Sequence, residues 1–280
     1  MSGDADEWRR LNRARWDEVV AIHLGPGGYD LSDLRAGQGR MNAIEEDELG
    51  PVAGLRVLHL QCHFGRDTLI LAQRGAQVVG LDFSAPAIEA AQGLARELGL
   101  DGQSRFVRAD LYDARAAIGE PAAFDMVYVT WGAICWLPDI AEWARIVAHF
   151  LKPGGALYLA EAHPTAYVFD DETRAANGMP GWFAPYFGAG AIAFDNPRDY
   201  MDPDARLTNS RTLQFIHPMG AIIGGLLQAG LRLDWLHEHD AITWHMFAVL
   251  VEDLRGLYRW PDKAWLPLSF SLRASKPALP

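Results

Sequence analysis

The pattern of hydrophobic and polar positions is clearest in residues 57–84. A short apolar run ends at Leu60, apolar residues at helical spacing follow, and a second apolar run over 78–81 ends in Asp82. Short apolar runs bounded by turn residues are typical of buried strands, and the spacing between them is typical of a helix. The stretch therefore predicts a strand, a tight turn, a helix and a second strand that ends in an acid.

The same alternation continues along the chain. Ser84 is predicted to cap a helix that has Pro86 in its first turn, and a Pro-Gly-Gly turn at 153–155 precedes the fifth strand. The patterns predict helices over 5–23, 42–49, 84–99, 138–151 and 217–229, and later strands over 104–107, 124–129, 156–160, 231–237 and 266–274. Strands alternating with helices predict an α/β domain.

Residues 165–210 break this periodicity, because aromatic side chains are scattered there among Gly, Pro and Asp. An irregular segment of this length in a compact domain is usually functional, so we expect a lid or specificity cap. Tyr29, after a Gly/Pro cluster, is expected in a second lid. The expected organisation is one domain, 1–280: N-terminal helix and lid 1–50, core 51–163, cap insertion 164–210, and the C-terminal part of the sheet 211–280.

Composition narrows the possible partners. The chain has 280 residues, with 25 Lys and Arg against 36 Asp and Glu, a net charge of −11. This balance argues against nucleic acid or an anionic membrane as a partner. Two cysteines, Cys62 and Cys135, are too few and too far apart for a zinc site or a disulfide framework. With no export signal and no apolar run of about 18 residues, a cytoplasmic protein is expected.

Two acids follow predicted strands. Asp82 ends the second strand and Asp110 follows the third. In nucleotide-binding βαβ units, a turn presents backbone N–H groups at a helix N-terminus, and an acid about 20 residues further on binds the ribose hydroxyls. Either Asp could merely cap its turn. Because open α/β sheets bind ligands at the carboxyl ends of their strands, the binding interpretation is favoured.

The order of these motifs resembles that of the class I S-adenosylmethionine-dependent methyltransferases, closely over 40–163 and loosely over 211–274. Residues 58–65 stand at the family's glycine-rich first motif, Asp82 and then Asp110-Leu111 follow the next two strands, and Leu-Lys-Pro-Gly-Gly at 151–155 is a further family mark. Only Gly65 remains of the first motif's glycines. A subset of bacterial small-molecule methyltransferases is similar at this turn and at 135–138.

The resemblance implies a Rossmann-like three-layer sandwich around a mostly parallel seven-stranded sheet whose last strand is antiparallel. It implies S-adenosyl-L-methionine as cofactor and a small, partly apolar acceptor, plausibly in secondary metabolism. Asp82 would bind the ribose, Asp110 the adenine, and the 61–65 backbone the methionine moiety. The implied cofactor-binding residues are Tyr29, Gln61, Cys62, His63, Gly65, Asp82, Phe83, Asp110, Leu111 and Thr130. For His63, packing against the helix start is an equal alternative.

Methyl transfer is an in-line displacement, so the protein need mainly align a nucleophile and remove its proton. The candidates for this base are Glu161, His163, His217 and His245. Each could instead make a structural hydrogen bond. Glu161 and His163 are two residues apart on an extended segment, so they point the same way.

Aromatic side chains suit a sulfonium through their quadrupoles, and core packing is their alternative fate. The expected substrate pocket comprises Trp131, Trp182, Tyr186, Phe187 and Trp244, whereas Trp143 is assigned to the core. The run His237-Glu238-His239 lacks a third nearby ligand, so no metal is expected.

Three alternatives remain open. An isoprenoid diphosphate could be methylated on carbon, with Glu161 as base and Arg174, Arg198, Arg206 and Arg211 on the diphosphate. A nicotinamide-dependent oxidoreductase would share the βαβ unit, but the chain lacks Gly-x-Gly-x-x-Gly. A non-catalytic binder could retain the fold. The acceptor atom and the oligomeric state are left open.

Overall fold

The computed structural model describes residues 6–202 and 204–278. The chain divides into two compact units. The first comprises Met1–Arg40, Pro51–Glu120 and Ala191–Gln214, and the second Met41–Gly50, Pro121–Gly190 and Phe215–Pro280. Part of the predicted cap insertion thus belongs to the first unit and part to the second.

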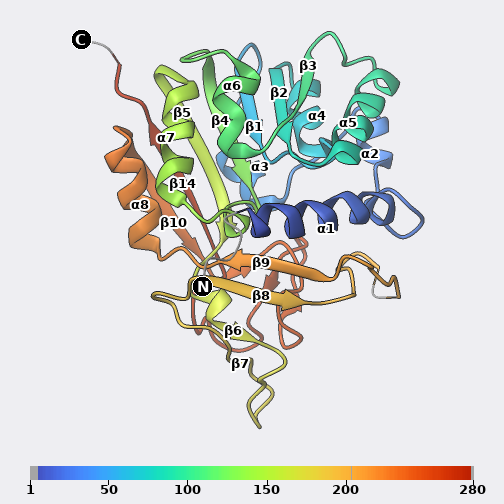
Figure 1. The fold of residues 1–280 in the computed structure, drawn as a ribbon, viewed down its shortest axis with the longest axis vertical. Helices are drawn as coiled ribbons and strands as arrows, with labels where there is room; N and C mark the ends of the chain where they lie inside the picture. The colour runs from blue at the N-terminus through green and yellow to red at the C-terminus, as the bar shows by residue number, and fades with distance from the viewer. Residues whose placement is uncertain (1–5, 203, 279–280) are drawn as a thin grey trace. The chain divides into compact units, whose positions relative to one another are not determined.

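The first unit contains the predicted βαβ arrangement. Its strands β1, β2 and β3 pair in parallel, and α4 and α5 pack beside them (Figure 1). Ser84 caps α5, as predicted, by accepting a hydrogen bond from the Ala87 amide. The elements are α1 Glu7–His23, α2 Ser32–Arg35, β1 Arg56–Leu60, α4 Arg66–Gln73, β2 Gln77–Asp82, α5 Ala85–Glu97, β3 Ser104–Arg108, the 3₁₀ turn η1 Leu111–Asp113, α6 Ala114–Ile118, β8 Ala191–Asp195 and β9 Arg211–Phe215, the last residue of which falls in the second unit.

The second unit carries the remaining strands of the main sheet. Its helices α7 and α8 pack against each other (Figure 1). The elements are α3 Ala43–Glu48, β4 Phe124–Thr130, η2 Ile134–Trp136, α7 Ile140–Phe150, β5 Leu151–Ala162, η3 Ala166–Val168, β6 Phe169–Asp170, β7 Gly181–Trp182, α8 Met219–Gln228, β10 Arg232–His239, β11 Ala241–Ile242, β12 Val251–Glu252, β13 Tyr258–Arg259 and β14 Ser269–Ser275.

The seven-stranded sheet has the order β10-β14-β5-β4-β1-β2-β3. The last strand, β14, runs antiparallel to both of its neighbours, whereas β4 pairs in parallel with β5. This arrangement confirms the predicted Rossmann-like sheet. Val57, Leu58 and Leu60 are fully buried, as expected for a parallel strand covered on both faces. Trp143 is also fully buried, which confirms its place in the core.

The Pro-Gly-Gly segment differs from its prediction. Residues 153–155 lie within β5, which starts directly after α7, rather than in a turn before the strand. The register with β4 shifts between Phe124 and Met126, so the segment forms an irregularity in a continuous strand. Gly154 has φ of 83°, a left-handed value that favours glycine. The structure also adds two short pairs, β6 with β7 inside the predicted cap, and β8 in the cap with β9 just after it.

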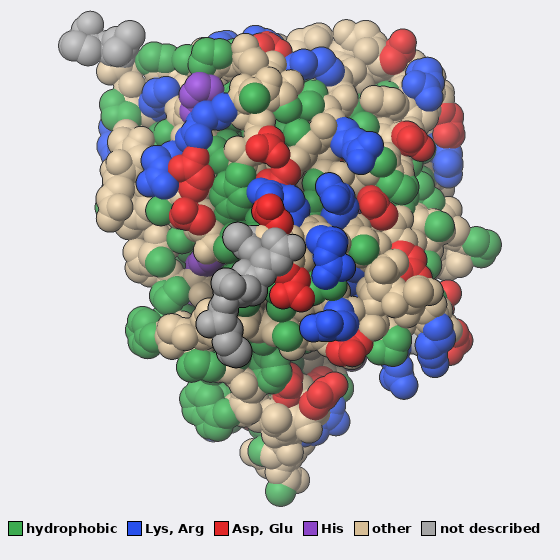
Figure 2. All heavy atoms as spheres, in the orientation of Figure 1, with side chains coloured by type: hydrophobic (Ala, Val, Ile, Leu, Met, Phe, Trp, Pro, Cys, Tyr) green, Lys and Arg blue, Asp and Glu red, His purple; other side chains and the backbone are tan. Residues whose placement is uncertain are grey.

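Charged side chains are mixed on the surface. On the face drawn in Figure 2, Lys and Arg side chains lie among Asp and Glu side chains rather than in one basic patch. Among the described residues, no helix combines the length and apolar character that crossing a bilayer requires.

Candidate functional site

The turn from β1 to α4 has an unusual backbone. Gln61, His63 and Gly65 have φ values of 57°, 51° and 78°. Left-handed values are uncommon for residues other than glycine, although His is among the more tolerant. At Gly65 a side chain would also collide, since an added Cβ would lie 2.7 Å from a Phe106 ring carbon. The one glycine retained in this motif is therefore required by both conformation and space.

Asp82 ties the end of β2 to this turn. Its Oδ2 accepts the His63 amide at 2.9 Å and its Oδ1 accepts the Ser84 amide at 2.9 Å. Burial raises the pKa of Asp82 to about 6, against the lowering effect of its amide bonds. The Phe83 amide also hydrogen-bonds Asp82, and because the two carboxylate oxygens together have about four lone-pair sites, the side chain keeps capacity to accept from a ligand.

Asp110 is paired with α1. Arg9 donates from Nε to Oδ2 at 2.8 Å and from Nη2 to Oδ1 at 3.3 Å, while the Tyr112 amide donates to Oδ1. Asp110 therefore caps the η1 turn and also neutralises Arg9. Leu111 is buried. Asp110 therefore has the turn-capping role that the sequence analysis gave as an alternative. Its ion pair with Arg9 was not predicted from the sequence.

Side chains of the helix α1 hydrogen-bond the backbone of residues 208–213, which follow β8. Asn12 exchanges two hydrogen bonds with the Leu213 backbone, and the Glu18 carboxylate accepts the Thr208 and Asn209 amides. Figure 1 shows α1 beside the β8–β9 pair. The helix α1 therefore lies against residues 208–213, the first of which belong to the predicted cap.

A buried polar network joins α1, the turn from β1 to α4 and residue 199. His23 Nδ1 lies 2.8 Å from His63 Nε2, and His23 Nε2 lies 3.2 Å from both oxygens of Asp199. The Trp16 ring meets the His63 ring edge-on, with centroids 5.2 Å apart. Burial lowers the pKa of His63 to about 3, and His23 adds to this effect. His63 is thus a neutral, packed member of the network.

Tyr29 lies beside this network. Its hydroxyl is 2.7 Å from the Tyr200 hydroxyl, and its ring meets Phe64 edge-on at 5.3 Å. The predicted second lid is therefore packed onto the turn from β1 to α4. The spacing of Trp16 and His23, seven residues apart on one predicted helix face, was the available signal for a network that sequence reasoning missed.

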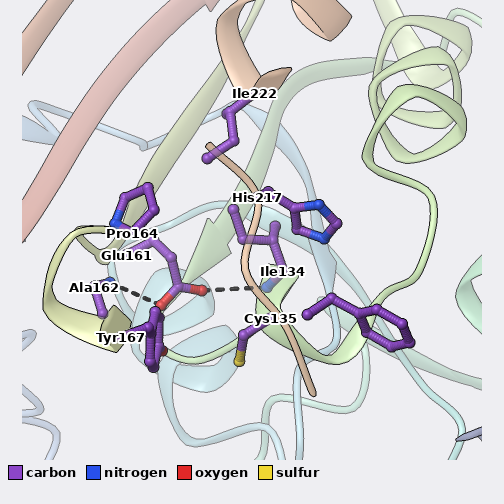
Figure 3. Close-up of a pocket in the computed structure, with 9 residues that line it drawn as sticks. Ile134, Cys135, Glu161, Ala162, Pro164, Tyr167, His217 and Ile222 are labelled. Atoms are coloured by element: carbon purple, nitrogen blue, oxygen red, sulfur yellow. Dashed lines mark hydrogen bonds between the residues drawn. The ribbon is translucent and has the colours of Figure 1, made fainter. Parts of the chain in front are cut away.

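In the second unit, Glu161 at the end of β5 is 1% exposed. Its Oε1 accepts the Gly132 and Ala162 amides at 2.7 and 2.8 Å, and its Oε2 accepts the Ala133 and Ile134 amides at 2.7 and 3.2 Å. Figure 3 draws two of these four bonds. Burial raises the pKa of Glu161, and the four amides oppose that shift. The carboxylate holds together the turn that follows β4.

A small pocket lies beside Glu161, with a cavity volume of about 10 Å³. His217 borders it, and its Nε2 lies 2.7 Å from the Leu137 carbonyl oxygen. Burial lowers the pKa of His217. The lining residues are Ile134, Cys135, Glu161, Ala162, Pro164, Tyr167, Phe215, His217 and Ile222 (Figure 3). The lining is mostly apolar, and sequence reasoning did not predict Pro164, Tyr167, Phe215 or Ile222.

The other two predicted bases lie outside this lining. His163 bonds through Nδ1 to the Thr165 hydroxyl at 2.7 Å and pairs through Nε2 with Glu238 at 3.1 Å. His245 is exposed and stacks on Tyr258, with centroids 5.0 Å apart. Of the four candidates, the structure brings together Glu161 and His217.

The predicted aromatic wall is arranged as separate pairs. Trp131 meets Trp244 at 6.2 Å, Tyr186 meets Phe187 at 4.7 Å, and Trp182 packs on Phe169 at 4.7 Å while staying 77% exposed. None of the five predicted side chains lines the pocket beside Glu161.

The two histidines of the 237–239 run have protein partners. His237 Nδ1 lies 2.8 Å from Glu48, and His239 Nε2 lies 2.9 Å from the Ser271 hydroxyl. In residues 6–202 and 204–278, no group of three or more His, Cys, Asp or Glu is placed to hold a metal ion.

Known proteins resemble this chain in sequence and in fold. Residues 57–155 match the model of a methyltransferase domain. A ubiquinone biosynthesis O-methyltransferase of Methylocella silvestris is 28% identical over 252 residues, 88% of this chain and 92% of that protein. The structure of a putative S-adenosylmethionine-dependent methyltransferase from Listeria monocytogenes has a TM-score of 0.59 at 18% identity, covering 87% of this chain and 98% of that one. Residues 57–155 thus match a methyltransferase domain, and the chain has the fold of S-adenosylmethionine-dependent methyltransferases.

Other relatives match this chain over a shorter length. A ubiquinone biosynthesis O-methyltransferase of Leptothrix cholodnii is 33% identical over 121 residues, which are 43% of this chain and 49% of that protein. The chain thus spans about half the length of that relative. A methyltransferase structure from Mesorhizobium loti, with a TM-score of 0.55 at 20% identity, shares the fold over 83% of this chain and 95% of that one.

The residues of this chain fit S-adenosylmethionine, the cofactor that the resemblance implies. That molecule carries a vicinal diol, an adenine, an ammonium and a carboxylate. Asp82 offers carboxylate lone pairs to a diol, and the N-terminus of α4 offers amides that no capping side chain occupies, since Gly65 is the N-cap. The chemistry of this donor set matches the groups to be held.

Proposed function

We propose that this methyltransferase transfers a methyl group from S-adenosylmethionine to a hydroxyl oxygen of a small, partly apolar acceptor. The observation that carries the proposal is the neutral imidazole of His217 at a mostly apolar pocket beyond the end of β5. The relative matched over 92% of its length is named an O-methyltransferase, which supports oxygen as the acceptor atom.

The cofactor would be held by the first unit. Asp82 would accept ribose hydroxyls, and the amides at the start of α4 would receive the methionine carboxylate. Asp110, next to Leu111, would meet the adenine while keeping its bond to Arg9. The sulfonium supplies a methyl group bound to a good leaving group, so the protein's task is to position the acceptor and remove its proton.

His217 is suited to that proton transfer. The Leu137 carbonyl can only accept, so His217 Nε2 carries the hydrogen in the 2.7 Å bond. His217 also hydrogen-bonds the Ile134 backbone, and in the neutral ring the nitrogen without the hydrogen, Nδ1, carries a lone pair. Because burial lowers the pKa of His217, the ring is neutral at pH 7 and can take a proton from an acceptor hydroxyl.

Glu161 is better suited to positioning. All four of its hydrogen bonds come from amides, two on each oxygen, and they fix the turn that carries Ile134 and Cys135 into the pocket lining. Carbon methylation of an isoprenoid diphosphate would require this carboxylate as base, and Arg174 of that hypothesis pairs with Asp171. Neither observation favours the carbon-methylating alternative.

The test is transfer of label from methyl-labelled S-adenosylmethionine to a panel of phenols, aliphatic alcohols and amines. We expect label on a hydroxyl acceptor. His217→Gln keeps an N–H donor for Leu137 but removes the base, so kcat should fall about 10²- to 10⁴-fold while cofactor affinity stays unchanged. His245→Gln, at an exposed site, is the matched control and should lose less than twofold. Label on amines alone, or a His217→Gln protein with normal kcat, would overturn the proposal.

A further inference from the structure

The helix α1 crosses the carboxyl ends of three neighbouring strands in the first unit (Figure 1). Arg9 bonds Asp110, which follows β3, and Trp16 packs on His63, which follows β1. The seven residues from Arg9 to Trp16 rise about 10 Å along a helix, and two strand spacings also amount to about 10 Å. The end of β2, where Asp82 lies, is therefore under the middle of this stretch.

Asp17 follows Trp16 on the helix. Its Oδ1 is buried and has no hydrogen-bond partner among the described residues. The charge of Asp17 contributes to the raised pKa of Asp82, so the two carboxylates lie within electrostatic reach of each other. A buried carboxylate oxygen without a donor is unfavourable, and a second carboxylate nearby makes it more so.

The two neighbouring carboxylates become favourable when a ligand supplies hydrogen-bond donors to them. The ribose of S-adenosylmethionine presents two neighbouring hydroxyls, each with one hydrogen to donate. Asp82 already uses part of its capacity on the His63 and Ser84 amides. Because Asp82 is partly occupied by these amides, a second carboxylate could accept the hydrogen of the other ribose hydroxyl.

We propose that Asp17 is a second ribose-binding carboxylate, whose buried Oδ1 accepts one hydroxyl of the cofactor while Asp82 accepts the other. The assignment rests on the proposed function, since it needs the cofactor in the first unit. It makes α1 part of the binding site, with Arg9 at the adenine end and Asp17 at the ribose.

Calorimetric titration with S-adenosylhomocysteine tests the assignment without relying on turnover. A hydrogen bond to a charged acceptor is worth roughly a tenfold to hundredfold change in affinity, so Asp17→Asn should weaken binding by that factor. Glu7→Gln removes the same charge from the first turn of the same helix and should change affinity less than twofold. The unliganded Asp17→Asn protein should melt at the same temperature as the wild type or higher, because an unpartnered carboxylate has been removed.

Analogues of S-adenosylhomocysteine that lack the 2′- or the 3′-hydroxyl locate the contact. The wild type should lose affinity for both, and Asp17→Asn should show no further loss on one of them, since that hydroxyl no longer has its partner. An Asp17→Asn protein with normal affinity would overturn the ribose assignment and leave the proposed function standing. Equal additional loss on both analogues, or a lowered melting temperature with general loss of affinity, would also overturn it. A wild type that binds no S-adenosylhomocysteine would instead overturn the proposed function.

Discussion

Replacing Glu161 by Gln should destabilise the fold as well as slow the reaction. The substitution keeps the size of the side chain but exchanges one carboxylate oxygen for an NH₂ group, which cannot accept a hydrogen bond. Whichever oxygen is replaced, two of the four backbone amides at Gly132, Ala133, Ile134 and Ala162 lose their acceptor and face another donor.

The size of the effect follows from these contacts. Each buried amide left without an acceptor costs about 1–3 kcal/mol, so two cost about 2–6 kcal/mol. That is a large share of the roughly 5–15 kcal/mol by which most proteins are stable. At about 2–4 °C per kcal/mol for a chain of this size, a middle value of about 4 kcal/mol lowers the melting temperature by roughly 12 °C.

Thermal unfolding followed by circular dichroism at pH 7 measures this loss. Glu252→Gln makes the same change at an exposed position, where the expected effect is within about 0.5 kcal/mol. If Glu161→Gln melted within 2 °C of the wild type and lost turnover alone, Glu161 would be a base, and its assignment as the organiser of the turn would be wrong.

Two further predictions concern pH. Because the folded pKa of Asp82 is about 6, the carboxylate is roughly one-tenth ionised at pH 5 and nine-tenths at pH 7, so affinity for S-adenosylhomocysteine should rise about tenfold over this range. The raised pKa also means that stability from Asp82 is present below its unfolded pKa and is lost as pH rises through about 6. Asp82→Asn should flatten both trends, and a pH-independent wild-type affinity would contradict them. For His217, whose pKa is lowered by burial, kcat/KM should rise with pH to a plateau, with its midpoint below the ordinary histidine value of 6.5, and a rate that falls as pH rises would exclude it as base.

The βαβ unit could be predicted because its signals are local. The apolar runs of β1 and β2, the Ser84 cap and the acid at the end of β2 are all contained in fewer than 50 consecutive residues. The attachment of α1 could not be predicted, because Asn12 bonds Leu213 and His23 meets Asp199 across most of the chain. Periodicity shows which face of a helix is apolar but not which distant segment covers it.

The candidate site was predictable to a similar extent. Asp82 and His63 were both predicted to bind the cofactor, and the His63 amide donates a hydrogen bond to the Asp82 carboxylate. For Glu161, the sequence allowed two roles, a catalytic base or a structural hydrogen-bond acceptor. It could not decide between them because residue types do not show which backbone amides point at a side chain. Trp182 and Trp244 were predicted to line the substrate pocket because aromatic rings suit a sulfonium. The rings that they contact depend on loop conformation, which the sequence does not show.

Calorimetric titration of the wild type and Asp82→Ala with S-adenosylhomocysteine, and separately with NADH, shows whether the chain binds the proposed cofactor through Asp82. We expect the wild type to bind S-adenosylhomocysteine and not NADH, and Asp82→Ala to reduce the affinity at least a hundredfold because a charged hydrogen-bond acceptor is removed. Binding of NADH alone, or an Asp82→Ala protein with normal affinity for S-adenosylhomocysteine, would contradict this expectation.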